Sequence, residues 1–239
     1  MLKTVKRFIK YLLRYEPLRE TAKVRYAIDT ARKKNLPYCP SFEGDLLFSL
    51  IRVKGFQKCL EMGFHTGSTA LYMLSAVADR GGHVTSVCID DDEGVERGLQ
   101  LLSDGGYIKH HHLVRKNSNI AIPEIFSSGE RFDFIFMDGW KTFDHLAFEI
   151  YYTNQMLERG GIIAFDDSNM QSVRKVIKLL IRYYGYEEID YTAYNQNFRL
   201  RLFHLLTRQS PHRPYRAFIK TLETKDQKPF KDWNFYRPI

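Results

Sequence analysis

Two short segments end in carboxylates that could hold a metal ion. Asp138 follows the apolar run 132–137, and Asp166 and Asp167 lie at the end of the run 161–166, behind a pair of glycines. If both runs are strands of one open parallel sheet, their carboxyl ends share an edge and the three side chains converge. Close carboxylates repel one another unless a cation lies among them, and oxygen ligands suit Mg²⁺, with Mn²⁺ or Ca²⁺ as alternatives. The simpler alternative is that each Asp caps the following helix.

A second segment turns on two glycines. Residues 59–69 run from an apolar strand through Glu61, Gly63 and Gly67 into a helix. Glycines allow a ligand to approach the backbone, and a helix N-terminus offers unpaired N–H groups. The spacing E-x-G-x-x-x-G differs from that of dinucleotide-binding and P-loop motifs. A tight strand-to-helix turn without a ligand is the alternative.

Acidic and short polar residues follow the next two predicted strands. Asp90 ends an apolar run some 20–25 residues after the glycine turn, a position where a carboxylate binds the ribose hydroxyls of a nucleoside. Asn117 and Ser118 follow a third strand and suit an adenine edge. The sequence therefore predicts a nucleoside-binding crevice beside the acidic trio.

The elements that position these residues alternate between helical and strand patterns from residue 42 onward. This alternation is typical of an α/β fold with a doubly wound, mostly parallel sheet. The predicted helices are 18–34, 42–54, 67–79, 93–103, 120–127, 143–158 and 170–184, after an amphipathic basic helix at 2–16. The predicted strands are 57–62, 83–89, 109–115, 132–137, 161–166, 186–191 and 198–206, the last two pairing antiparallel. The domains expected are N-terminal basic helices (1–40), a catalytic domain (41–206) and a basic C-terminal tail (207–239).

Charge is unevenly distributed along the 239 residues. The net charge of +8 divides into +8 for residues 1–36, −5 for 37–206 and +5 for 207–239. The basic ends favour an anionic surface or partner, or contact with the acceptor. Three cysteines without metal-ligand spacing, and an N-terminus without an apolar signal region, favour the cytoplasm. No apolar run reaches the length of a membrane span.

The residues now described resemble class I S-adenosylmethionine-dependent methyltransferases over about 41–190. The resemblance includes Ser41-Phe42-Glu43-Gly44 ahead of a helix, the glycine turn, the second-strand acid and Asn117-Ser118. It implies the seven-stranded order of that class. Later segments resemble the metal-dependent O-methyltransferases of the catechol and macrolide-sugar types. The resemblance implies that S-adenosylmethionine is bound by Glu43, Glu61, Gly63, Gly67, Ser68, Asp90, Asn117, Ser118 and Asp138.

The same resemblance assigns the chemistry. It implies that Asp138, Asp166 and Asp167 bind a divalent metal, most simply Mg²⁺, and that Lys141 in Asp138-Gly139-Trp140-Lys141 is the general base. A nearby dication and partial burial favour a neutral, basic amine. One departure from the family is Cys88, which stands where the ribose-binding acid is usual. Asp90, two residues later and on the same face of the strand, could replace it.

These features predict an O-methyltransferase acting on a hydroxyl of a small molecule or of a sugar or glycan. Other readings are an RNA-binding or RNA-modifying protein using the basic ends, and a catalytically silent scaffold. A nicotinamide-dependent dehydrogenase is disfavoured by the glycine spacing. A homo-oligomer and peripheral membrane contact are further expectations for the basic arms.

Overall fold

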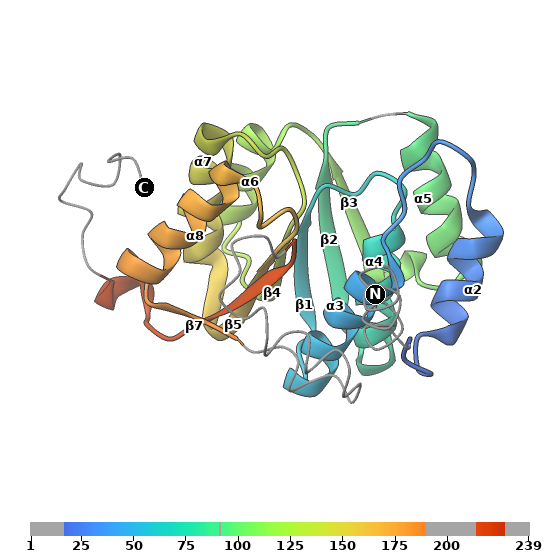
Figure 1. The fold of residues 1–239 in the computed structure, drawn as a ribbon, viewed down its shortest axis with the longest axis horizontal. Helices are drawn as coiled ribbons and strands as arrows, with labels where there is room; N and C mark the ends of the chain where they lie inside the picture. The colour runs from blue at the N-terminus through green and yellow to red at the C-terminus, as the bar shows by residue number, and fades with distance from the viewer. Residues whose placement is uncertain (1–16, 91, 190–213, 228–239) are drawn as a thin grey trace, which may run out of the picture.

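The sheet at the centre of the molecule has seven strands in the order β3-β2-β1-β4-β5-β7-β6. The computed structural model describes residues 17–90, 92–189 and 214–227 (Figure 1). Five strands are parallel, and β7 is antiparallel to both β5 and β6. The strands are β1 (Lys58–Met62), β2 (His83–Cys88), β3 (His111–Arg115), β4 (Phe132–Met137), β5 (Leu157–Phe165), β6 (Tyr186–Glu188) and β7 (Arg216–Lys220).

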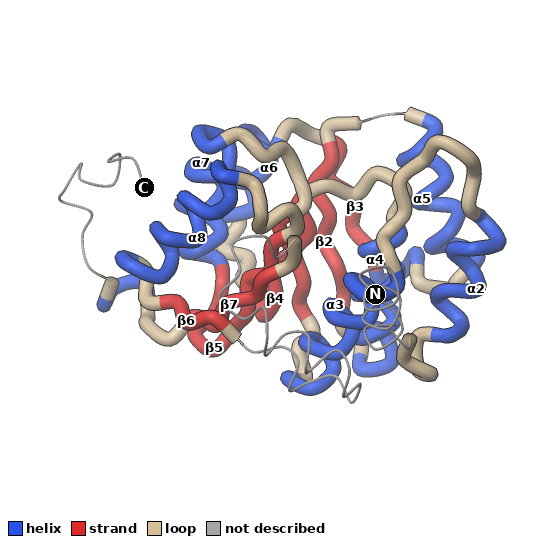
Figure 2. The backbone as a smooth tube through the Cα atoms, viewed as in Figure 1, coloured by secondary structure: helices blue, strands red, loops and turns tan. Residues whose placement is uncertain are grey.

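Helices cover both faces of the sheet, as Figure 2 shows. The α-helices are α2 (Ala22–Ala31), α3 (Ser41–Lys54), α4 (Ser68–Val77), α5 (Glu93–Asp104), α6 (Ser118–Ser127), α7 (Phe143–Met156) and α8 (Gln171–Tyr183). Helices α2 to α5 contribute to one hydrophobic cluster and α6 to α8 to the other. No helix in the described part of the chain is long and apolar enough to cross a membrane.

The strand sequences explain why there are two cores. Alternate residues of a strand face opposite sides of the sheet. In β4, Phe134 and Phe136 belong to the cluster under α2–α5, whereas Ile135 and Met137 belong to the cluster under α6–α8. All four are buried. The sheet thus holds the two helical layers together and leaves the strand ends free for the site.

The predicted α/β fold and its strand order are confirmed, and most predicted elements occur within a few residues of their expected bounds. The exception is the seventh strand. It is formed by residues 216–220, within the segment predicted as a basic tail, and it lies between β5 and β6. The strand is only five residues long and begins and ends with the charged residues Arg216 and Lys220, so its buried Ala217 and Phe218 give no strand pattern in the sequence. The predicted helix 2–16 and strand 198–206 lie outside the described residues.

Candidate functional site

A cavity of about 740 Å³ opens at the carboxyl ends of the parallel strands. Its walls come from the segments after β1, β2, β3, β4 and β5, from the start of α3, and from Tyr215 just before β7. The volume falls within the range of small-molecule sites, and the position is where open α/β sheets bind ligands.

The glycine turn after β1 forms one wall. Gly63 has φ +93°, and a Cβ atom there would lie 2.6 Å from the backbone oxygen of Asp138, so only glycine fits. Gly67 has φ +65° and caps α4. Thr66 and Ser68 on either side of it line the cavity, whereas Gly67 itself does not. The Ser68 hydroxyl accepts a hydrogen bond of 2.8 Å from the backbone N–H of Cys39.

Glu61 lies beneath this turn and does not line the cavity. Its carboxyl group is fully buried, accepts a short hydrogen bond from Thr69 and accepts one of 2.6 Å from Ser86. Burial raises the pKa of Glu61 to about 8. Glu61, predicted to contact the cofactor, reaches the cavity in this structure through Thr69, which lines it.

The residues predicted to bind a nucleoside also line the cavity. Asp90 lies just beyond β2, with its Oδ2 atom 3.7 Å from the Cys88 Sγ atom. The side chain of Asn117 caps α6 by accepting a hydrogen bond from the backbone N–H of Asn119. The Ser118 hydroxyl lies 2.8 Å from Nε2 of His145. Asp90, Asn117 and Ser118 thus share one cavity, as the sequence predicts.

Asp138 and Asp166 meet at the ends of β4 and β5. The backbone N–H of Asp138 donates to the Met62 carbonyl at 3.0 Å, and that of Asp166 donates to the Met137 carbonyl at 3.2 Å. These bonds continue the parallel ladder and bring the two carboxylates side by side. Burial, with the charge of Asp138, raises the pKa of Asp166 to about 7.

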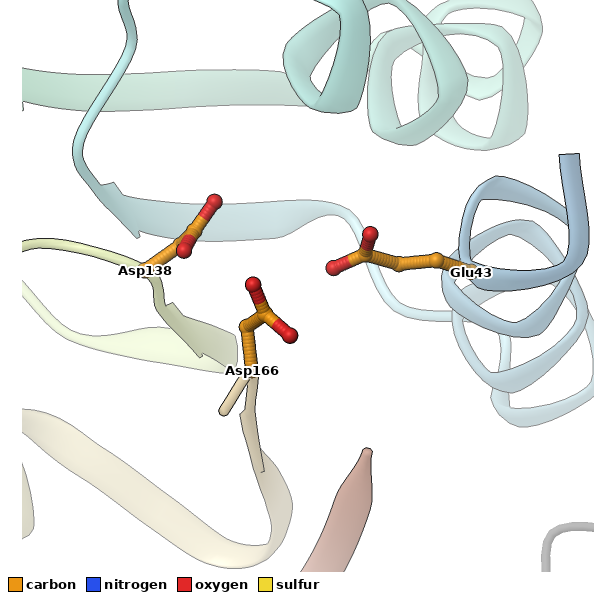
Figure 3. A group of neighbouring side chains, drawn as sticks. All are labelled: Glu43, Asp138 and Asp166. Atoms are coloured by element: carbon orange, nitrogen blue, oxygen red, sulfur yellow. The ribbon is translucent and has the colours of Figure 1, made fainter. Parts of the chain in front are cut away.

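Asp167 does not join this pair. Its backbone N–H donates to Oδ1 of Asp166 at 2.6 Å, and its φ of +52° lies in the left-handed region. Its side chain is about half exposed and its Oδ2 atom lies 3.8 Å from Nζ of Lys141. The third carboxylate beside Asp138 and Asp166 is instead Glu43, on the first turn of α3 (Figure 3).

Lys141 lies against Asp138. Its Nζ atom donates to Oδ1 of Asp138 at 2.9 Å and to the Gly139 carbonyl at 3.2 Å, and its side chain is mostly buried. Lys141 therefore contacts Asp138 and Asp167 without itself lining the cavity.

Glu149 and Tyr215 also line the cavity, and neither was assigned a role from the sequence. Glu149 is buried on α7, its Oε1 atom lies 2.9 Å from Nε2 of His145, and its Oε2 atom has no hydrogen-bond partner. Tyr215 interacts with Glu43, and burial raises its pKa. No local sequence pattern marks Glu149 as a site residue, because it lies two turns into a helix rather than at the end of a strand. Tyr215 lies in the segment predicted as a basic tail. The aromatic residues of that segment suggest that it packs on another surface, but the sequence does not show which surface.

Several known proteins are similar to this chain in sequence. Residues 60–168 match the model of a family described as a methyltransferase domain. The caffeoyl-CoA O-methyltransferase of Populus kitakamiensis is 28% identical over 134 residues, which is 54% of this chain and 54% of the relative. The matches to curated relatives span between 50% and 61% of the relatives' own length.

Solved structures share the fold at low sequence identity. A methyltransferase from Geobacter sulfurreducens superposes with a TM-score of 0.60 at 17% identity, covering 92% of this chain and 97% of that one. An O-methyltransferase from Bacillus cereus, solved in complex with S-adenosylhomocysteine, gives a TM-score of 0.56 at 16% identity, covering 92% and 100%. The predicted resemblance is therefore confirmed: the chain has the fold of class I S-adenosylmethionine-dependent methyltransferases, and residues 60–168 match a methyltransferase domain.

Proposed function

We propose that this protein is an S-adenosylmethionine-dependent O-methyltransferase that acts, with a divalent metal, on a hydroxyl of a small molecule or sugar. The observation that carries the proposal is the meeting of Asp138 and Asp166 on the wall of the cavity, with Lys141 2.9 Å from Asp138. Helix capping alone does not account for two strand ends placing their carboxylates together in a cavity.

The cavity suits the cofactor in size and in the order of its polar groups. S-adenosylmethionine would supply an electrophilic methyl group on its sulfonium. Asp90 would accept hydrogen bonds from the ribose hydroxyls, and Asn117 and Ser118 would contact the adenine edge. The turn from Gly63 to Ser68 presents the N-terminus of α4, which favours a carboxylate. Glu61 would act indirectly, by holding Thr69.

The acidic residues and Lys141 would activate the acceptor. A divalent cation held by Asp138 and Asp166 would supply positive charge that acidifies the acceptor hydroxyl. Lys141 would take up the proton from that hydroxyl, and Asp138 would position the Lys141 amine. S-adenosylmethionine would supply the methyl group: the acceptor oxygen would bond to the methyl carbon as the carbon–sulfur bond breaks, and S-adenosylhomocysteine would leave. Holding the two reactants in line in one cavity supplies much of the rate gain.

The cavity mouth offers an apolar surface to the acceptor. Trp140 and Ile89 both line the cavity, and both are mostly exposed although they are large and apolar. Such side chains can pack against an aromatic ring or against the face of a sugar ring. This surface supports a phenol or a glycoside as the acceptor.

Methyl transfer from radiolabelled S-adenosylmethionine to a panel of phenols and glycosides tests the proposal. We expect transfer to at least one hydroxyl compound in the presence of Mg²⁺ and none with excess chelator. Asp166→Ala should abolish transfer, a loss of at least about 100-fold, while changing S-adenosylhomocysteine affinity less than about threefold. Asp133→Ala, at the opposite end of β4, is the matched control. Equal transfer with chelator present would show that the aspartates are structural.

We further propose that the protein acts in a reducing compartment, for which the cytoplasm is the simplest assignment. The cysteines Cys39, Cys59 and Cys88 are all buried and unpaired. Free buried thiols are usual where disulfides do not form.

A further inference from the structure

A chain of three polar side chains, Ser118, His145 and Glu149, lines the cavity. Ser118 begins α6, and His145 and Glu149 lie one turn apart on α7. The Oγ atom of Ser118 lies 2.8 Å from Nε2 of His145, and the Oε1 atom of Glu149 lies 2.9 Å from the same nitrogen. Two oxygens therefore share one ring nitrogen, and that nitrogen cannot serve both as donor and as acceptor.

Glu149 decides which role the nitrogen takes. The residue is only 1% exposed, and in the described part of the chain its Oε2 atom has no hydrogen-bond partner and His145 is its one ion-pair partner. Because a buried carboxylate is costly without a donor, the His145 hydrogen lies on Nε2 and is donated to Oε1. This hydrogen bond to Glu149 raises the pKa of His145, which keeps the hydrogen in place.

The Ser118 hydroxyl is left with a hydrogen to donate. A ring nitrogen that carries a hydrogen cannot accept one, so the Ser118 oxygen is a second acceptor of the His145 N–H. Among the described residues, His145 is the only hydrogen-bond partner of the Ser118 side chain. The arrangement is the reverse of an activated serine nucleophile, in which Nε2 accepts the serine hydrogen and the acid binds Nδ1. The Ser118 hydrogen is therefore available to a ligand in the cavity.

We propose that His145 and Glu149 are positioning residues that make the Ser118 hydroxyl a hydrogen-bond donor to one ring nitrogen of the cofactor's adenine. A ring nitrogen of adenine accepts such a bond, whereas a C–H group in its place does not. The chain thereby makes the site selective for a base with an acceptor at that position. The inference deepens the proposed function and rests on it, because it takes the cavity to bind the nucleoside of S-adenosylmethionine.

Calorimetric titration with S-adenosylhomocysteine and its 1-deaza, 3-deaza and 7-deaza analogues tests the donor. In each analogue a C–H group replaces one ring nitrogen of the adenine. We expect wild type to bind at least one analogue about tenfold or more weakly than S-adenosylhomocysteine. For one such analogue, Ser118→Ala should bring the two affinities within about threefold of each other. Equal binding of all four ligands by wild type, or ratios that Ser118→Ala leaves unchanged, overturns the proposal.

Glu149→Leu tests the positioning role. Without the carboxylate, His145 can carry its hydrogen on Nδ1, and its Nε2 atom then competes for the Ser118 hydrogen. We expect the ratio of affinities for the selected analogue and S-adenosylhomocysteine to fall below about threefold. Gln155→Leu, on the same helix but outside the cavity, should leave that ratio at its wild-type value. A purely structural role of Glu149 would weaken both ligands equally, and an unchanged ratio in Glu149→Leu overturns the proposal.

Nitrogen NMR of the labelled wild-type chain gives a test that does not depend on how well Glu149→Leu folds. We expect a hydrogen on Nε2 of His145, with the signal assigned by its loss in His145→Gln, and an unprotonated Nε2 overturns the proposal. A wild type that binds S-adenosylhomocysteine and all three analogues equally also overturns it, but leaves the cofactor site standing. A wild type that binds none of the four ligands contradicts the proposed function itself.

Discussion

Asp138 is the residue at which the parts of the site meet. Its backbone oxygen faces Gly63, its carboxylate accepts from Lys141, and the same carboxylate belongs to the trio with Glu43 and Asp166. A displacement of this one residue should therefore disturb the cofactor turn, the proposed base and the proposed metal site together.

Gly63→Ala tests that dependence. The new Cβ atom would lie 2.6 Å from the Asp138 backbone oxygen, so either the turn or Asp138 must move. We expect at least about a tenfold loss of S-adenosylhomocysteine affinity, measured by calorimetry. Gly81→Ala is the control, because Gly81 has φ +75° but nothing within 4 Å of the added atom. That variant should lose about 1 kcal/mol of stability and no affinity. Similar affinities of the two variants would argue against a close contact at Gly63.

Glu61 makes a pH-dependent contribution to stability. Burial raises its pKa from 4.5 to about 8, so the folded protein keeps a proton that the unfolded chain releases between these values. The contribution of protonated Glu61 to the free energy of unfolding is fully present below about pH 4.5 and is lost as the pH rises toward 8. Glu61→Gln removes this loss and can still hydrogen-bond to Thr69 and Ser86. Relative to wild type, the variant should gain at least about 1 kcal/mol of unfolding free energy between pH 5 and pH 8, measured in urea. A difference that stays constant with pH would show that Glu61 is ionised in the fold.

The sequence could identify which residue types gather at the site but not the direction in which each points. Asp138 and Asp166 were predictable because each ends an apolar run. Asp167 was predicted to join them; its left-handed backbone, which has no signature in an Asp-Asp pair, places its carboxylate 3.8 Å from Lys141. Glu43 was predicted to bind cofactor, and its approach to the aspartates depends on how α3 packs on α4.

At the scale of elements, the antiparallel end of the sheet is the feature that the sequence did not locate. β7 is anchored by Lys220, which is buried and whose Nζ atom donates to the carbonyls of Asn154 at 2.6 Å and Leu157 at 2.8 Å. From the sequence alone, a lysine at the end of a short apolar segment is expected to lie at the surface. Only the packing shows that it ties β7 to the junction of α7 and β5, at the end of the sheet opposite the cavity.

Lys220→Met tests this anchor. The change leaves two buried carbonyls without their donor, so the free energy of unfolding should fall by about 2–4 kcal/mol. Lys225→Met, at an exposed position in the next turn, should change it by less than about 0.5 kcal/mol. Chemical denaturation of both variants gives the comparison. Equal stability would mean that β7 stays in the sheet without the lysine.

At the scale of the whole molecule, the net charge of +8 says little about the chemistry. Residues 37–206 carry a net charge of −5, and the carboxylates that matter here lie within them. The α/β fold could be predicted because helix and strand patterns alternate along most of the chain. The acceptor could not, because acceptor-binding segments need no regular pattern. The basic arms remain the parts of the chain through which an anionic acceptor or partner could be bound.

Calorimetric titration of the wild-type chain with S-adenosylhomocysteine tests whether the cavity binds the cofactor. We expect binding of one molecule per chain, with S-adenosylmethionine competing and adenosine binding more weakly. Asp90→Ala should weaken binding by about tenfold or more, because the ribose hydroxyls lose their acceptor. No heat of binding, with or without Mg²⁺, would show that this protein is not an S-adenosylmethionine-dependent enzyme.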